Sequence, residues 1–155
     1  MMRQPVQVLV YPSRVVCSGR EYLLLRRIAS RGGHWQGVTG GVEDDESLEE
    51  TAKRELFEET GFVSSALKQT EYSYSFPIRD EWRDMYAAGV ETIVEYVFVA
   101  VVDSGQEPAI TWEHDEWQWC SCSQALRLLK WPENIEALKR CDSYLNVRLD
   151  ADSVD

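Results

Sequence analysis

The sequence lacks any hydrophobic run long enough to cross a bilayer, since its longest apolar stretches, such as 97–102, are short. Its first residues lack the apolar core and the small-residue cleavage site of a signal peptide. Repeats, low-complexity tracts and an interdomain linker are also missing from the sequence. We therefore expect a single domain over all 155 residues, located in the cytoplasm.

Basic residues are scarce: 16 Lys and Arg stand against 27 Asp and Glu, which gives a formal net charge of −11. A chain with this charge repels polyanions, so tight binding of a nucleic acid polymer is not expected. A small phosphorylated substrate stays compatible with the charge if a metal ion supplies local positive charge. The expected partner is thus a small molecule, not a nucleic acid or a membrane, and the sequence leaves a homodimer open.

Cysteines are few, and none of them forms a C-x-x-C pair. They are Cys17, Cys120, Cys122 and Cys141. Reduced thiols packed as small hydrophobic side chains are the favoured interpretation. A zinc site built from Cys120, Cys122 and His114 is the alternative.

Strand-like and helix-like stretches mix along the chain without strict alternation. The expected strands cover 6–11, 22–26, 72–77, 93–102 and 116–120, with a short extended piece over 35–42. The expected helices lie between Ser47 and Gly61 and over 124–129 and 134–140, and the expected loops over 30–33 and 78–89. An acidic tail from about Leu149 is expected to be loose. This mixture predicts an α/β fold of the α+β type, a mixed sheet with helices on both sides.

The most informative segment is 40–62, GGVEDDESLEETAKRELFEETGF. Ser47 and Glu50 have the S-x-x-E spacing of a capping box, and Gly61 suits the C-terminal end of the helix. Without a Cβ, Gly40 and Gly41 would let the backbone approach a ligand closely, so that a main-chain carbonyl reaches a metal ion. A plain tight turn is the alternative for this glycine pair.

A helical wheel at about 100° per residue places three acidic side chains near the apolar stripe of this helix. The stripe expected to face the core comprises Leu48, Ala52 and Leu56. Glu59 lies within this stripe, Glu55 lies beside it, and Glu58 lies toward its edge. The remaining charged side chains are predicted on the solvent side: Glu49, Glu50, Lys53 and Arg54.

A run of charged residues usually forms a solvated surface. That interpretation does not fit Glu55 and Glu59, which are predicted to face inward. Glu55 and Glu59 are one turn apart, with Cβ atoms about 6 Å from each other. Two partly desolvated like charges at this distance are unfavourable without a counter-charge. A raised carboxyl pKa would relieve the conflict, and so would a hard cation such as Mg²⁺, which prefers carboxylate oxygens.

The same segment resembles the complete Nudix box. Gly40, Glu46 and the run 54–62, RELFEETGF, match all of the fixed positions of that motif at its spacing. The resemblance implies the Nudix fold, a mixed β-sheet sandwiched between α-helices. It also implies a Mg²⁺- or Mn²⁺-dependent hydrolase of a nucleoside diphosphate linked to another group. Glu46 would stabilise the loop and take no part in the chemistry.

Carried over residue by residue, the resemblance assigns metal ligands and a supporting arginine. Glu55 and Glu59 are implied as ligands, and Glu58 as a further ligand, direct or through water. The Gly40 carbonyl would join them. Arg54 would orient a glutamate through charge-assisted hydrogen bonds.

A narrower resemblance, to the dihydroneopterin triphosphate pyrophosphohydrolase branch of the family, covers most of the chain. It rests on short segments in the same order: 34–43, 86–90 with Glu95 downstream, 111–114 and 131–134. In that branch the glutamate of the third segment supplies a metal ligand from outside the box, which here is Glu113. Segment 70–85 departs from the branch, so the residues that would hold the substrate ring do not follow from it.

For such an enzyme, Mg²⁺ would neutralise the triphosphate charge and polarise the attacked phosphoryl group, with release of pyrophosphate and a monophosphate. The candidates for the general base are Glu55, Glu58 and Glu113. The candidates for substrate binding are Arg27 and Arg79 for phosphate, Trp35 for stacking on a flat ring, and Tyr86 and Glu95. We interpret four further tryptophans as structural: Trp112, Trp117, Trp119 and Trp131. His34 and His114 could bind phosphate or donate a proton, but a structural role is the favoured interpretation of a lone histidine.

Other functions remain open. One is hydrolysis of a different nucleoside diphosphate derivative, such as an oxidised dNTP or a dinucleoside polyphosphate. Another is a non-catalytic Nudix domain that senses a nucleotide, which the presence of Glu55, Glu58 and Glu59 disfavours. A structural acidic domain without a site is disfavoured by the helical wheel.

Overall fold

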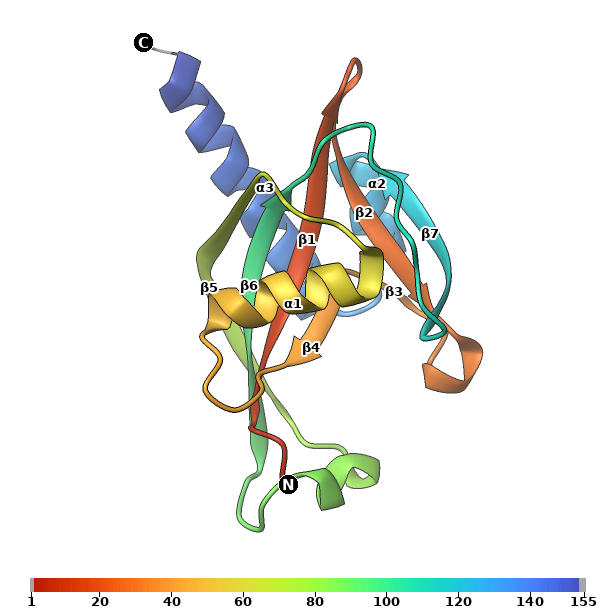
Figure 1. Ribbon diagram of the computed structural model, residues 1–155, viewed down its shortest axis with the longest axis vertical. Coiled ribbons are helices and arrows are strands. Elements are labelled where there is room, and N and C mark those ends of the chain that lie inside the picture. Colours follow the sequence, from red (N-terminus) through yellow and green to blue (C-terminus); the bar gives the residue numbers. More distant parts are fainter. Residues whose placement is uncertain (1, 154–155) are drawn as a thin grey trace.

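A single mixed sheet organises the molecule, and β1 (Val6–Val16) is its central strand (Figure 1). The computed structural model describes residues 2–153, and the side chains of residues 2–147. β1 pairs in parallel with β6 (Thr92–Val101) and antiparallel with both β2 (Gly19–Arg27) and β4 (Val38–Gly41). The outer strands are β5 (Ala66–Pro77) beside β6, and β3 (Trp35–Gln36) and β7 (His114–Cys120) beside β2.

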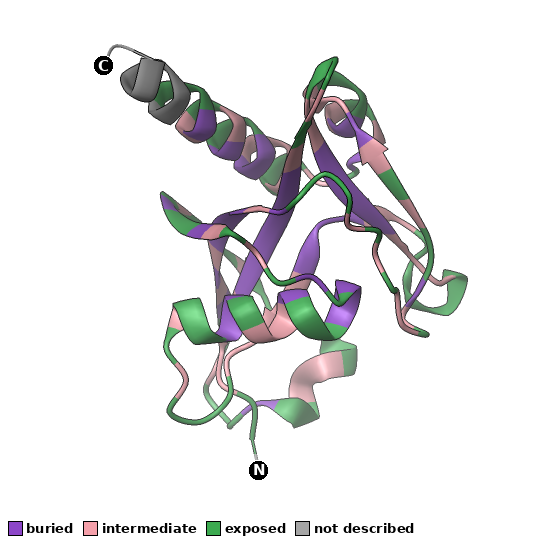
Figure 2. Ribbon diagram, turned by 45° about the horizontal axis from the view of Figure 1, so that its top comes forward, coloured by how far each residue is buried: buried purple, intermediate pink, exposed green. Residues whose placement is uncertain are grey.

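Helices cover both faces of this sheet, as Figure 1 shows. Side chains alternate along β1, so Val8 and Val10 face one side and Leu9 and Tyr11 the other. α1 (Leu48–Thr60) packs on the first side, and α2 (Cys122–Leu128) and α3 (Pro132–Ser153) on the second. Buried residues accordingly lie along the central strands, on the sheet-facing side of α1 and along α3 (Figure 2). The predicted mixed sheet between helices is confirmed.

The ends of the predicted elements differ from the observed ones where long-range pairing or capping intervenes. β5 begins at Ala66, before the predicted strand, because Ala66 to Gln69 already pair with β6. α2 begins earlier because the Ser121 hydroxyl caps it by accepting a hydrogen bond from the Gln124 amide. The predicted loops contain short 3₁₀ turns, η1 (Ala29–Arg31) and η2 (Asp80–Met85).

The prediction of a loose tail from Leu149 is wrong as far as Ser153, because α3 continues to that residue. Once a helix is nucleated, each added residue fixes one more backbone hydrogen bond, so an acidic sequence alone does not end it. The rest of the predicted tail, residues 154–155, lies outside the described residues.

The distance between His114 and Cys120 excludes the alternative zinc site. His114 and Cys120 are the first and last residues of β7, and an extended strand of this length separates its ends by about 20 Å. All four cysteines are free thiols. Cys120 and Cys141 are buried, as expected of small hydrophobic side chains, whereas Cys17 is exposed, so the expectation is wrong for that residue. Within residues 2–153, no helix combines the length and the apolar content needed to cross a membrane.

Candidate active site

The ends of α1 are set locally, as the sequence predicted. The Ser47 hydroxyl accepts a hydrogen bond from the Glu50 amide, and the Glu50 carboxylate accepts one from the Ser47 amide. The helix ends at Gly61, whose φ of 76° lies in the left-handed region that favours glycine. With both ends held in this way, Ala52 and Leu56 face the sheet and are buried.

Two glutamates of α1, Glu55 and Glu59, point inward with these apolar residues, which confirms the helical-wheel prediction for them. Glu59 is only 4% exposed, and the Glu55 side chain is 13% exposed. Burial and the neighbouring Glu55 carboxylate raise the pKa of Glu59 to about 10, and burial also raises the pKa of Glu55. Glu59 Oε2 is buried and has no hydrogen-bond partner among the described residues. Without a cation, the raised pKa of Glu59 keeps the pair from carrying two buried charges near pH 7.

Gly40 of β4 lies directly against the Glu55 carboxylate. A Cβ built on Gly40 would overlap the Glu55 side chain, whereas one built on the neighbouring Gly41 would meet open space. Glycine at position 40 therefore serves the close approach of the strand to Glu55. This places the Gly40 backbone beside a predicted metal ligand.

Arg54 lies half-buried at the centre of a charged network, so its predicted placement on the solvent side is wrong. Its Nε and Nη2 atoms donate to the two Glu46 carboxylate oxygens at 2.7 and 2.9 Å, and Nη2 also donates to the Gly41 carbonyl at 2.9 Å. Nη1 donates to Glu55 Oε1 at 2.8 Å and to Glu58 Oε2 at 3.2 Å. These partners compensate the burial of the guanidinium and tie the loop before α1 to the helix.

Glu46 is held as the resemblance implied, as part of the loop. Its carboxylate also accepts hydrogen bonds from the Glu43 amide at 2.9 Å and the Thr51 hydroxyl at 3.0 Å. The hydrogen bonds from Arg54 are the main cause that lowers the pKa of Glu46 to about 2. A carboxylate engaged on both oxygens in this way is a structural anchor.

Glu58 and Glu113 lie at the rim of the buried pair. The Glu58 side chain is 55% exposed and contacts Arg54. Glu113, in the loop before β7, lies 3.8 Å from Arg31 Nη1, and its charge adds to the raised pKa of Glu59. The half-buried guanidinium of Arg27 acts in the opposite direction on Glu59. The fold thus brings Glu113 and Arg27 near α1 from separate parts of the chain.

His114 lies beside Glu59, and the sequence favoured a structural role for it over phosphate binding or proton donation. Its ring is buried, and Nε2 lies 3.7 Å from Glu59 Oε1. Burial, with a smaller effect of Arg27, lowers the pKa of His114 to about 4, so the imidazole is neutral near pH 7. Neither ring nitrogen has a hydrogen-bond partner within the described chain. No local sequence signal marks this contact, since the two residues meet only in the tertiary structure.

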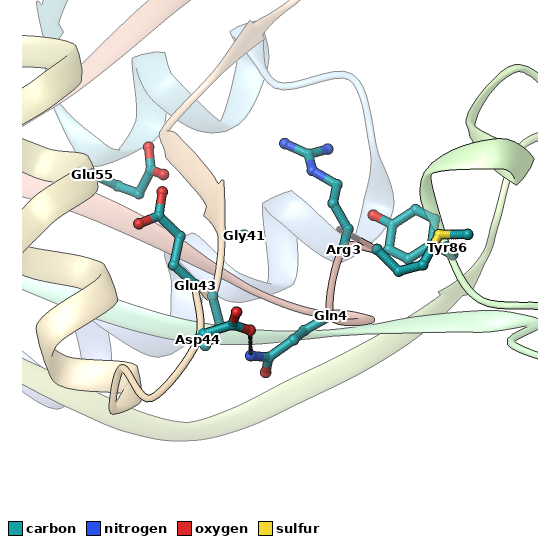
Figure 3. Close-up of a pocket in the computed structure, with 9 residues that line it drawn as sticks. Arg3, Gln4, Gly41, Glu43, Asp44, Glu55 and Tyr86 are labelled. Atoms are coloured by element: carbon teal, nitrogen blue, oxygen red, sulfur yellow. Dashed lines mark hydrogen bonds between the residues drawn. The ribbon is translucent and has the colours of Figure 1, made fainter.

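A pocket of about 470 Å³ opens beside Glu55 (Figure 3). Figure 3 shows the Glu55 and Glu43 carboxylates on one side of it and the Arg3 guanidinium on the other. The Arg3 side chain makes no hydrogen bond or ion pair with another described residue, and the predicted substrate residue Tyr86 also lines the pocket. Sequence reasoning missed Arg3, because a single N-terminal arginine carries no pattern.

Three predicted substrate residues lie apart from this pocket. Trp35 packs against the core cluster on the α3 side of the sheet. Glu95 is buried and accepts hydrogen bonds from Gln7, at 2.8 Å, and from the Tyr74 hydroxyl. Arg79 lies over the ring of Trp82. Their roles in binding remain predictions.

The tryptophans interpreted as structural divide into two kinds. Trp117 and Trp119 pack against the core cluster under α1, as expected. Trp131 contacts His34 edge to face, with ring centroids 6.1 Å apart. Trp112, in contrast, is 67% exposed, and only the Arg31 guanidinium is found over its ring, at 4.8 Å, among the residues that the structure describes.

The donor set of this region fits a hard divalent cation in its chemistry. Glu55 and Glu59 offer buried carboxylate oxygens, one of them without a partner, and the Gly40 backbone lies against them. Among side chains of residues 2–147, no three His, Cys, Asp or Glu converge as a ready-made metal site. Glu58 and Glu113, held by Arg54 and Arg31, would have to turn inward to complete one.

The sequence and the structure of this chain are both similar to those of known proteins. The model of the NUDIX domain family matches residues 6–141. Dihydroneopterin triphosphate diphosphatase of Haemophilus influenzae is 34% identical over 110 residues, which cover 68% of this chain and 69% of that protein. An RNA pyrophosphohydrolase of Caulobacter vibrioides is 35% identical over 131 residues, covering 79% of this chain and 72% of that protein. The structure of Escherichia coli dihydroneopterin triphosphate pyrophosphohydrolase superposes with a TM-score of 0.74 at 27% identity, covering 90% of this chain and 95% of that one.

Proposed function

The chain belongs to the NUDIX domain family, and we propose that it hydrolyses a phosphoanhydride bond in a nucleoside-triphosphate-like small molecule, with Mg²⁺ or Mn²⁺ as cofactor. Dihydroneopterin triphosphate or a deoxynucleoside triphosphate is the proposed substrate, and pyrophosphate and a monophosphate are the products. The observation that carries the proposal is the buried Glu55–Glu59 pair with an unpartnered carboxylate oxygen.

Each acidic side chain has a proposed part in holding the metal. Glu55 and Glu59 would bind it, with the Gly40 carbonyl beside them and Glu58 and Glu113 at the rim. When bound, the ion would neutralise phosphate charge, polarise the attacked phosphoryl group and make water more acidic. Arg54 keeps the Glu55 carboxylate oriented through its hydrogen bond at 2.8 Å.

The pocket beside Glu55 offers a place for the anionic end of the substrate. The Arg3 guanidinium lines this pocket and has no carboxylate partner among the residues described, so it is available to a phosphate. Arg27 supplies a second positive charge on the side of Glu59 and Glu113. The proton lost by the attacking water would pass to a carboxylate of the cluster, and water would add across the broken P–O bond.

The charge of the chain favours a small substrate over a polymer. A net charge of −11 opposes binding of a polyanionic RNA, whereas a free triphosphate needs only the local cations of the site. The relative from Haemophilus influenzae is named for such a small triphosphate. The RNA pyrophosphohydrolase relative makes a 5′-triphosphorylated RNA the necessary competitor in any test.

A substrate panel tests the proposal directly. The full chain is incubated with Mg²⁺ and, separately, dihydroneopterin triphosphate, dATP, an oxidised dNTP, a dinucleoside polyphosphate and a triphosphorylated RNA, and the products are identified. We expect pyrophosphate and a monophosphate from a small triphosphate, and no turnover in EDTA. Release of pyrophosphate from the RNA alone would replace the proposed substrate, and no metal-dependent product from any compound would indicate a non-catalytic domain.

Glu113→Ala is expected to slow turnover and raise the Mg²⁺ concentration needed for half-maximal rate, because a rim ligand is lost. The expected loss is roughly 10- to 100-fold, in the range seen when a residue that supports a metal site is removed. Glu107→Ala, an exposed glutamate of the same loop, is the matched control. An unchanged Mg²⁺ dependence of Glu113→Ala would remove Glu113 from the site.

A further inference from the structure

His114 is a buried polar side chain without a partner, and the function described so far does not use it. Its side chain is fully buried, and neither Nδ1 nor Nε2 forms a hydrogen bond with a described residue. Glu59 Oε1 lies 3.7 Å from Nε2. Glu59 Oε2 is also buried and unpartnered. Two adjacent buried groups thus have unused hydrogen-bonding capacity at one place.

Such an arrangement is costly for a purely structural contact. A buried polar atom without a partner loses its hydration and gains nothing in return. An apolar side chain would fill the same volume behind α1 at lower cost. The free energy lost by desolvating the imidazole is offset in a state of the protein in which the imidazole forms a hydrogen bond.

The geometry points to that state, and we propose that His114 is a positioning residue that orients Glu59 for a divalent cation. In that state the ring would donate its Nε2 hydrogen to Glu59 Oε1, and the unpartnered Oε2 would remain for the cation. This inference rests on the proposed function, because it assigns a role only if Glu59 binds a metal.

The separation of 3.7 Å is slightly longer than a hydrogen bond and suits this role. A movement of a few tenths of an ångström by either side chain would close the contact. Hydrogen bonds from outside the ligand shell commonly orient metal ligands in this way.

Four single variants in the full chain and the double variant Glu59→Gln/His114→Leu test the assignment. His114→Gln carries an amide that reaches the place of Nε2, whereas the shorter His114→Asn does not. His114→Leu removes the donor and keeps the volume, and Glu59→Gln removes the ligand charge. The measurements are the dissociation constant of Mn²⁺, from the electron paramagnetic resonance signal of the free ion, and the melting temperature in EDTA.

We expect His114→Leu and His114→Asn to bind Mn²⁺ roughly 10- to 100-fold more weakly than the wild type, the range for loss of an outer-shell partner. His114→Gln should stay within about threefold of the wild type, since it restores the donor. His114→Leu should melt in EDTA at or above the wild-type temperature, because it removes unpartnered buried polar atoms. In the Glu59→Gln background, His114→Leu should weaken Mn²⁺ binding no further.

The two proposals fail in different ways. If the wild type binds no Mn²⁺ and releases no pyrophosphate, the proposed function itself is wrong. If the wild type binds Mn²⁺ and His114→Asn or His114→Leu binds it equally well, only the role of His114 is overturned. Equal losses in His114→Gln and His114→Asn, or a loss that follows a lower melting temperature in EDTA, would show a structural role instead.

Discussion

Glu59→Gln is expected to abolish turnover while the fold stays intact. The substitution removes the charge from the most buried carboxylate of α1 and keeps its size and shape. A neutral amide is a poor ligand for a hard cation, so the loss should exceed about 100-fold, beyond the range for residues that only support ligands. Initial rates at saturating Mg²⁺, with the best substrate of the panel, measure the effect.

The stability of Glu59→Gln separates a metal ligand from a structural glutamate. Burial and the Glu55 charge already favour the neutral form of Glu59, so a neutral amide should not lower the melting temperature in EDTA. Glu49→Gln is the matched control on the same helix, because Glu49 is exposed and has only an ion pair with Lys53 at 3.6 Å. Wild-type activity in Glu59→Gln, or equal losses in both variants, would mean that Glu59 is not a ligand.

Gly40→Ala is expected to cost activity on the order of 100-fold, as misplacement of a reacting group by about 1 Å does. The added methyl group would overlap the Glu55 carboxylate, so that either Glu55 or the β4 backbone must move. Both changes would displace a proposed ligand from its observed position against Gly40. The rate at saturating Mg²⁺ and the Mn²⁺ dissociation constant measure the loss.

The neighbouring glycine supplies the control for this prediction. A Cβ on Gly41 would meet open space, and Gly41 has an ordinary negative-φ backbone, so Gly41→Ala should keep the Mn²⁺ dissociation constant within about threefold of the wild type. If Gly40→Ala retains wild-type activity, Glu55 does not need its observed position. If Gly41→Ala is equally impaired, the defect reflects the rigidity of β4 and not the contact with Glu55.

Short-range features of the active site could be predicted because they depend on neighbours in the sequence. The capping box at Ser47 and the left-handed Gly61 set the ends of α1, and the helical period then turns Glu55 and Glu59 toward the sheet. The predicted close approach of Gly40 and Gly41 to a ligand stays a prediction, whereas the structure shows a close approach of Gly40 to the Glu55 side chain and none at Gly41. The resemblance to the Nudix box added the roles of these residues and the identity of the fold.

The helical wheel wrongly placed Arg54 on the solvent side because a wheel considers only residues of the helix itself. On an isolated helix Arg54 would face water, but the loop before α1 folds back and supplies Glu46 and the Gly41 carbonyl as partners. A side chain with this many charge-assisted hydrogen bonds is stable in a half-buried position. The predicted substrate residues Trp35 and Glu95 lie apart from the pocket because their side chains belong to the sheet face opposite α1.

By itself, the sequence determined the mixed class of fold, the ends of α1 and the inward turn of its glutamates, because capping and helical periodicity act over a few residues. Only the tertiary structure decided that Arg3 and Tyr86 line one pocket with Glu55, and that His114 lies behind Glu59. These contacts join residues far apart along the chain, through the pairing of β1, β2, β4 and β7 in one sheet. Strand pairing of this kind depends on the whole core, and no local pattern encodes it.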